Sequence, residues 1–144
     1  RLMSRGLGDV YKRQGGKRPS GFNKGFYYEP TVFDKVEDNF TIMKEEPFGP
    51  LVPMLAFKSF DEVIERANDN DLGLCSYLYT NSMDKANRGS ELLETGCVAV
   101  NTGAVAIAEA PFGGIKQTGY GREGGSMAIK DYLNVKYTHM DLKA

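Results

Sequence analysis

Between residues 51 and 101 the sequence twice places a strand-like segment before an amphipathic helix, and a third strand-like segment follows. The three apolar segments are residues 51–57, 74–80 and 97–101. Short connections join them to the helices, and no repeat or low-complexity tract interrupts the series. Strands and helices that alternate in this way form right-handed crossovers and a mostly parallel sheet. The predicted fold class is therefore α/β.

Residues that typically cap helices mark the limits of both predicted helices. The first follows SFDE, where Ser59 and Glu62 have the spacing of a capping box, and it stops at the polar NDNDLG. The second is capped by Asn81 or Ser82 and runs to about Glu94.

Further elements are predicted on both sides of this series. Residues 31–36 form a short strand, and Pro53 places the strand 51–57 at a sheet edge or a bulge because proline lacks a ladder N–H. A short helix, residues 126–133, leads into NVKYTHM, which alternates as a half-exposed strand does. Such a strand has an unpaired edge, which a partner subunit can cover.

The composition is that of a globular domain and excludes several classes of function. The 144 residues are 41% hydrophobic and 26% charged. The net charge of −1 does not indicate binding to nucleic acid or to a membrane surface. No apolar run reaches the ~18 residues of a transmembrane helix, and no secretory signal is evident. Two cysteines and one histidine make neither a disulfide framework nor a metal site. The expected location is the cytoplasm.

The first 14 residues, RLMSRGLGDVYKRQ, are basic and have no clear period. Residue 1 is arginine, and the stretch resembles translated adapter sequence fused to an incomplete gene. We therefore expect residues 1–14 to be a non-native leader and the native sequence to begin at Gly15. A short native segment is the alternative.

Residues 103–125 hold seven glycines and little periodicity. A loop of this length inside a compact domain is uncommon and usually functional. Within it, GYGREG at 119–124 matches the dinucleotide-binding pattern, and Asp141 follows at about the spacing of a ribose-binding acid. The lead-in GGIKQT is polar, whereas that pattern needs a buried strand running into its first glycine. A structural loop is the preferred interpretation, and a phosphate-binding loop the alternative.

A stiff turn, EEPFGP, precedes the strand at residue 51. It places Glu45 and Glu46 directly before Pro47 and Phe48. One interpretation is a solvated loop that enters a sheet. The other is a binding corner, in which a carboxylate binds hydroxyl groups and the ring binds a flat ligand.

No catalytic constellation is evident among the reactive side chains. Cys75 and Cys97 lie on predicted buried strands without a cation or histidine to lower the thiol pKa, so they are predicted to be core residues. His139 has no identifiable acid or nucleophile beside it. Glu109 lies on the glycine-rich loop, where it could face either way.

Three stretches together resemble the C-terminal part of the aldehyde dehydrogenase superfamily: EEPFGP at 45–50, NTG at 101–103, and PFGGIKQTGYGREGG at 111–125. Their order and spacing match from about Gly15 to the end, and NTGAVAIAEAPFGGIK is most similar to the succinate-semialdehyde dehydrogenase branch. The resemblance implies an oxidoreductase fragment. Residues 15–132 are then the rear of the catalytic domain, and residues 133–144 a strand that joins an oligomerisation sheet and makes a homo-oligomer.

The resemblance also implies roles for individual residues. Glu46 holds the ribose hydroxyls of NAD or NADP, and Phe48 packs beside the nicotinamide. Ala106 and Phe112 line the path of the aldehyde substrate. The branch is expected to have a serine at the position of Ala106 to bind the distal carboxylate of succinate semialdehyde, so this alanine leaves the natural aldehyde open.

The implied reaction is thiolate attack on the aldehyde, hydride transfer to NAD(P)+ and hydrolysis of the thioester. The family's nucleophilic cysteine and general-base glutamate lie upstream of Gly15, so no catalytic residue is assigned and the chain alone is expected to be inactive. One alternative is a free-standing, non-catalytic module that binds a partner through its terminal strand. Another is a small nucleotide-binding protein that uses GYGREG.

Overall fold

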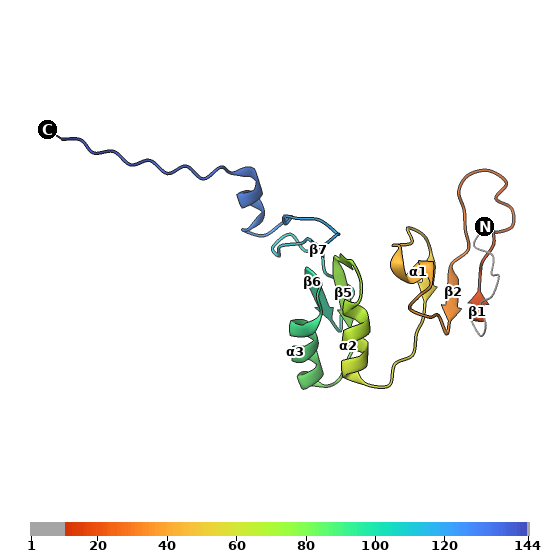
Figure 1. The fold of residues 1–144 in the computed structure, drawn as a ribbon. Helices are drawn as coiled ribbons and strands as arrows, with labels where there is room; N and C mark the ends of the chain where they lie inside the picture. Colours follow the sequence, from red (N-terminus) through yellow and green to blue (C-terminus); the bar gives the residue numbers. More distant parts are fainter. Residues whose placement is uncertain (1–10, 144) are drawn as a thin grey trace. The chain divides into compact units, whose positions relative to one another are not determined.

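The computed structural model describes residues 11–143 and divides into two compact units, residues up to Arg66 and residues from Ala67 onward. Figure 1 shows the elements of each unit. Among the described residues, the first unit has one sheet of three strands and the second unit has two sheets of two strands each. Both contain a parallel pair of strands connected through a helix, which confirms the α/β class.

The first unit is built on a sheet with the strand order β1-β2-β3. β1 (Tyr11–Gln14) is antiparallel to β2 (Thr31–Asp34), and β2 is parallel to β3 (Leu51–Pro53). Pro53 therefore lies on an edge strand, as predicted, where its missing N–H interrupts no ladder. The strand ends at this proline and is shorter than the predicted segment 51–57.

Two elements of this unit were not predicted. β1 lies in the segment 1–14 that the sequence predicts to be a leader, of which residues 1–10 are outside the described part of the chain. α1 (Thr41–Lys44) is a single turn, too short to display a helical period. It ends at Glu45, which is extended and donates its N–H to the Thr41 carbonyl oxygen at 2.9 Å.

Thr31 has no exposed surface and joins separate parts of the first unit. Its hydroxyl donates to the Glu29 carbonyl oxygen and accepts from the Gly16 N–H, each at 2.7 Å. Its own N–H donates to the Pro50 carbonyl oxygen at 2.8 Å. Since both the hydroxyl and the N–H of this buried residue have partners, Thr31 secures the start of β2 to the turn before β3.

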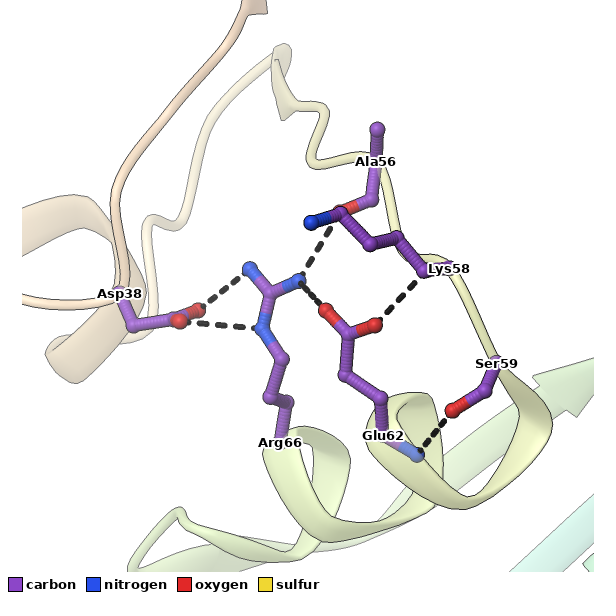
Figure 2. Close-up of polar contacts among 6 residues, drawn as sticks. All are labelled: Asp38, Ala56, Lys58, Ser59, Glu62 and Arg66. Atoms are coloured by element: carbon purple, nitrogen blue, oxygen red, sulfur yellow. Dashed lines mark hydrogen bonds and ion pairs between the residues drawn. The ribbon is translucent and has the colours of Figure 1, made fainter.

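α2 (Phe60–Asn68) begins with the predicted capping box, which Figure 2 shows. Ser59 Oγ accepts from the Glu62 N–H at 3.1 Å. Glu62 Oε2 accepts in return from the Lys58 N–H at 2.8 Å, one residue before the N–H that a capping box usually engages. Two backbone donors at the start of the helix are thereby satisfied.

Arg66, in the last turn of α2, ties together three segments of the first unit (Figure 2). Its Nε and Nη2 each donate to one carboxylate oxygen of Asp38 at 3.0 Å, and its Nη1 donates to the Ala56 carbonyl oxygen at 2.9 Å. Lysine cannot reproduce this planar, bidentate pairing. Asp38 and Ala56 lie on either side of α1 and β3 in the sequence, so Arg66 holds both ends of the segment between them.

The capping box should make the start of α2 sensitive to acid. The Lys58 N–H that Glu62 accepts is the main cause that lowers the pKa of this carboxyl below its usual value. A group with a lowered folded-state pKa contributes stability above its unfolded-state pKa, about 4.3 for Glu, and loses it as the pH falls through the folded-state value. We expect hydrogen-exchange protection of the Lys58 amide, corrected for intrinsic exchange, to fall over this acidic range. Glu62→Gln should abolish that dependence and Glu65→Gln should leave it, whereas flat protection in the unmodified protein would contradict the assignment.

The second unit contains the parallel pair β5 (Cys75–Leu78) and β6 (Cys97–Val100). α3 (Met83–Leu92) connects them and begins at the predicted cap, Ser82, whose Oγ accepts from the Lys85 N–H at 3.3 Å. The helix ends slightly before the predicted Glu94 because Leu93 is already extended.

A second pair in this unit joins β4 (Leu72–Gly73) to β7 (Ile115–Lys116) in antiparallel orientation. β7 lies within the glycine-rich stretch and was not predicted. Two residues are too few to display an alternating pattern, and the strand exists because β4, more than forty residues earlier, pairs with it. Each antiparallel pair of named strands among residues 11–143 thus contains a strand that the sequence did not reveal: β1 in one pair, and both β4 and β7 in the other.

The C-terminal segment follows η1 (Ala128–Tyr132), a 3-10 helix within the predicted short helix 126–133. Residues 133–143 are exposed throughout and form no strand in the described chain (Figure 1). Val135 is fully exposed and Tyr137 is 84% exposed, so the single chain lacks the predicted half-burial. The pairing of this segment with a partner subunit stays a prediction. None of the helices among residues 11–143 has the length and apolarity that crossing a membrane requires.

Candidate functional site

The turn 45–50 has a hydrogen-bonded backbone. The Gly49 N–H donates to the Pro47 carbonyl oxygen and the Leu51 N–H to the Gly49 carbonyl oxygen, both at 2.8 Å. Each bond closes a three-residue turn, and Pro50 is the central residue of the second, where the fixed φ of proline suits an inverse γ-turn. The two prolines therefore restrict the turn, as the sequence predicts.

Glu46 and Phe48 project from this turn. Phe48 is 94% exposed and Glu46 is also exposed. Among residues 11–143, no hydrogen bond or ion pair engages the Glu46 carboxylate. Both side chains are therefore available to a ligand, with the acid able to accept hydroxyl donors and the ring able to pack on a flat group.

The base of the turn is fixed to the rest of the first unit. The Pro50 carbonyl oxygen accepts the N–H of the buried Thr31, and Arg66 holds the chain at Asp38 and Ala56 on either side of the turn (Figure 2). A ligand at the turn thus meets a backbone that is already ordered. Less conformational entropy is lost on binding to such a site than to a free loop.

In the second unit, β6 leads into the glycine-rich loop through Asn101, which has a left-handed φ of 56°. Asn101 Oδ1 accepts from the Thr80 N–H and Nδ2 donates to the Thr80 carbonyl oxygen, each at 2.9 Å. The side chain thereby continues the pairing of β5 and β6 for one more residue. Asparagine is among the few non-glycine residues that adopt this φ readily.

The glycine-rich loop, residues 103–125, folds back on itself. Phe112 and Glu123 exchange two backbone hydrogen bonds of 2.7 Å. Gly124 beside this bridge has a φ of 71°, and a Cβ there would lie 2.9 Å from the Ala110 carbonyl oxygen. Position 124, where the loop crosses itself, therefore requires glycine, because any other residue would be strained at this φ and its Cβ would clash with backbone atoms.

The structure places the four predicted site residues as two pairs. Glu46 and Phe48 share the turn of the first unit. Ala106 and Phe112 share the loop of the second unit, where Ala106 is exposed before the crossing and Phe112 is half-buried within it. Their roles toward a cofactor and an aldehyde stay predictions.

The segment GYGREG lacks the surroundings of a dinucleotide-binding loop. The preceding strand, β7, is only two residues long and ends at Lys116, before Gly119. The Arg122 N–H, which a phosphate would need, donates to the Asp131 carboxylate at 2.9 Å. The Arg122 Nη1 donates to the Gly114 carbonyl oxygen, also at 2.9 Å. These contacts fit the structural loop that the sequence favours.

Lys116 is an anchor of the second unit that the sequence did not reveal. Its Nζ donates to the carbonyl oxygens of Asn68 and Asn70 at 2.8 and 3.0 Å and pairs with Glu94 Oε2 at 2.7 Å. All three ammonium protons are therefore engaged, at the end of α2 where carbonyl groups lack helical partners. No local signal predicts this, because the two carbonyl partners lie 48 and 46 residues earlier.

The reactive side chains do not form a catalytic group among themselves. Cys75 and Cys97 are free thiols and half-buried, rather than fully buried as predicted. His139 Nδ1 lies 3.4 Å from the Tyr137 hydroxyl on the exposed C-terminal segment. Within residues 11–143, no group of three His, Cys, Asp or Glu side chains is placed to hold a metal ion.

Comparison with known proteins identifies the family. The model of the aldehyde dehydrogenase family matches residues 8–138 of this chain. The chain belongs to the aldehyde dehydrogenase family. It is 50% identical, over 78% of its length, to 3-sulfolactaldehyde dehydrogenase from Pseudomonas putida, and 47% identical, over 85%, to the mitochondrial succinate-semialdehyde dehydrogenase of Arabidopsis thaliana. It covers 23% of each, so the chain spans about a quarter of the length of these curated relatives.

The fold is likewise that of solved aldehyde dehydrogenases. The NAD+ complex of an aldehyde dehydrogenase from Bacillus cereus matches with a TM-score of 0.87 and 41% identity, over 94% of this chain and 27% of that chain. The predicted membership of the aldehyde dehydrogenase family, with semialdehyde dehydrogenases among the relatives, is confirmed. The family match begins at residue 8, inside the segment 1–14 that was predicted to be a leader.

Proposed function

We propose that this chain is the C-terminal part of an NAD(P)+-dependent aldehyde dehydrogenase that oxidises an aldehyde to a carboxylate. The observation that carries the proposal is the turn 45–50, where an unpartnered carboxylate and an exposed ring stand two residues apart on an anchored backbone. The cysteine that forms the thioester and the general-base glutamate are proposed to come from residues outside this chain. The chain alone is then inactive.

The chemistry of Glu46 and Phe48 fits the nicotinamide half of the cofactor. A carboxylate can accept both ribose hydroxyls in charge-assisted hydrogen bonds, and an aromatic face suits a flat heterocycle. The cofactor supplies the hydride acceptor, and this chain holds its ribose and ring in place. The match to an NAD+ complex of a relative supports the assignment.

Ala106 and Phe112 are proposed to line the path of the aldehyde. Neither side chain carries a hydrogen-bond donor. A carboxylate-bearing substrate such as succinate semialdehyde therefore needs a donor from a neighbouring residue, whereas a less polar aldehyde needs none.

Ala106→Ser should shift the preference of the intact enzyme toward a carboxylate-bearing semialdehyde. The serine hydroxyl would donate to the charged carboxylate of the substrate. We expect this hydrogen bond to contribute roughly 1.5–2 kcal/mol, the low end of the range for charged partners, which corresponds to about a 10- to 30-fold gain in relative kcat/KM. The measurement compares succinate semialdehyde with butanal for the unmodified enzyme and the variant. Ala104→Ser, on the same loop, is the control and should leave kcat/KM for both aldehydes unchanged. An unaltered ratio in Ala106→Ser would mean that this position does not face the substrate.

Assembly and location are part of the same proposal. We propose a cytoplasmic homo-oligomer in which residues 133–144 pair with a partner subunit. The exposed apolar side chains of Val135 and Tyr137 support the proposal that a partner subunit covers this segment. Two free cysteines suit a reducing compartment. The same exposed segment favours the second candidate, a free-standing module that binds a partner without catalysis.

The two candidates differ in the size and activity of the native protein. Peptides from residues 15–144 identify it in its source cells, and the purified species is assayed for aldehyde-dependent formation of NADH or NADPH. We expect a species several times heavier than 15.9 kDa with this activity. A species near 15.9 kDa without activity would overturn the proposal in favour of the binding module.

A further inference from the structure

The two cysteines of the chain stand opposite each other on neighbouring strands. β5 and β6 are parallel, and their register pairs Cys75 directly with Cys97. Neighbouring strands lie about 4.8 Å apart, which is inside the Cα separation of about 4.4–6.8 Å that disulfides require. Both residues are half-buried free thiols, and the sequence contains no other cysteine.

The surroundings join these thiols to each other and to the glycine-rich loop. Burial raises the pKa of the Cys75 thiol, and the facing Cys97 thiol adds to the rise. Cys97 Sγ in turn lies 3.7 Å from the Gly113 carbonyl oxygen, to which its S–H donates weakly. One thiol therefore faces the partner strand and also tethers the loop that carries Ala106 and Phe112.

We propose that Cys75 and Cys97 form a reversible dithiol–disulfide couple that low-molecular-weight disulfides oxidise. The thiolate of one cysteine attacks a sulfur of the small disulfide and expels one small thiolate, which leaves a mixed disulfide. The thiolate of the other cysteine attacks the protein-bound sulfur, forms the Cys75–Cys97 bond and expels the second. The two protons lost by the cysteines end on the two released thiols, so the protein loses two electrons and the small disulfide gains them.

The position of the couple determines how the bond behaves. Side chains of directly opposite residues on parallel strands project side by side, so their Cβ atoms lie about as far apart as the strands, about 4.8 Å. The mean Cβ separation in disulfides is about 3.8 Å, so the two side chains must tilt toward each other to form the bond. A bond made under such strain is readily reduced. The oxidised Cys97 sulfur carries no hydrogen, so the tether to Gly113 is lost when the bond forms. An effect of this loss on substrate binding by the glycine-rich loop rests on the proposed function, whereas the formation of the disulfide does not.

Mass mapping of the full-length protein tests the couple independently of enzyme activity. The protein is incubated with oxidised glutathione, alkylated and digested with trypsin, which leaves Cys75 in the peptide 67–85 and Cys97 in the peptide 89–116. We expect these peptides to appear joined, lighter by two hydrogen atoms than their sum, and to separate after dithiothreitol. Recovery of both as alkylated or glutathione-bound single peptides, or linkage only to other chains or other cysteines, would overturn the proposal.

Single variants test the second step of the exchange. In Cys75→Ser no second thiol can displace the bound glutathione, so Cys97 should persist as a mixed disulfide with glutathione. In Cys97→Ser the mixed disulfide should persist on Cys75 if the Cys75 thiol also attacks. Cys97 remaining unmodified in Cys75→Ser, with Cys75 unmodified in Cys97→Ser, would contradict the mechanism. The mapping of the unmodified protein decides the proposal even where a variant fails to fold.

Discussion

Gly96→Ala should lower the free energy of unfolding of the full-length protein by about 3 kcal/mol, the upper end of the range for overpacked sites. A Cβ at Gly96 would fall well inside van der Waals contact with the Gly113 carbonyl oxygen, 2.8 Å from the Gly113 carbonyl carbon and 3.0 Å from Gly114 Cα. All of these are backbone atoms, so no change of rotamer can relieve the overlap. Either the start of β6 or the glycine-rich loop must move.

Denaturant unfolding of matched variants measures this effect. Gly103→Ala is the control, because Gly103 lies near the other end of β6, at the start of the glycine-rich loop, does not have a positive φ and has no atom within 4 Å of the position that the alanine Cβ would take. Its stability should change by no more than about 0.5 kcal/mol. Equal stability of the two variants would show that residues 113–114 do not pack against the start of β6 in solution.

The start of each long helix could be predicted because it depends on residues close together in the sequence. Ser59 and Glu62 form their capping box over four residues, and Ser82 caps α3 over a similar span. The α/β class follows for the same reason, since it requires only the order of strands and helices. The end of α3 was less well predicted, because the sequence places it at about Glu94 whereas Leu93 already leaves the helical conformation.

The elements that were missed depend on distant partners. Phe112 pairs with Glu123, and β7 pairs with β4, although none of these segments displays a period of its own. Lys116 likewise has partners more than forty residues away. Conversely, the alternating pattern of residues 134–140 is present in the sequence, but no strand of the described chain pairs with it.

For the candidate site, the sequence revealed the turn but not what secures it. Paired acids, prolines and a ring indicate a stiff corner through local chemistry alone. Thr31 and Arg66, which anchor that corner, carry no recognisable motif because their partners are brought together only by folding. The assignment of Glu46 and Phe48 to a cofactor therefore depends on a functional test.

Glu46→Gln should lower kcat of the intact enzyme roughly tenfold or more at saturating cofactor. The amide keeps the shape of the side chain and loses the charge, so the ribose hydroxyls no longer donate to a carboxylate. Hydrogen bonds to charged groups contribute about 1.5–3 kcal/mol, clearly more than neutral ones. Because Glu46 has no partner among residues 11–143, the substitution should leave the fold unchanged, and the melting temperature of the variant should match that of the unmodified enzyme.

Glu45→Gln separates a specific role of Glu46 from the charge of the turn. Glu45 is also exposed, and its contribution to the end of α1 comes from its backbone N–H, which the substitution retains. The kcat of the Glu45→Gln enzyme should therefore stay close to that of the unmodified enzyme. Equal losses in both variants would indicate that the turn acts only through its net charge. An unchanged rate in Glu46→Gln would remove this carboxylate from the cofactor site, and the turn would then be the solvated loop that the sequence also allowed.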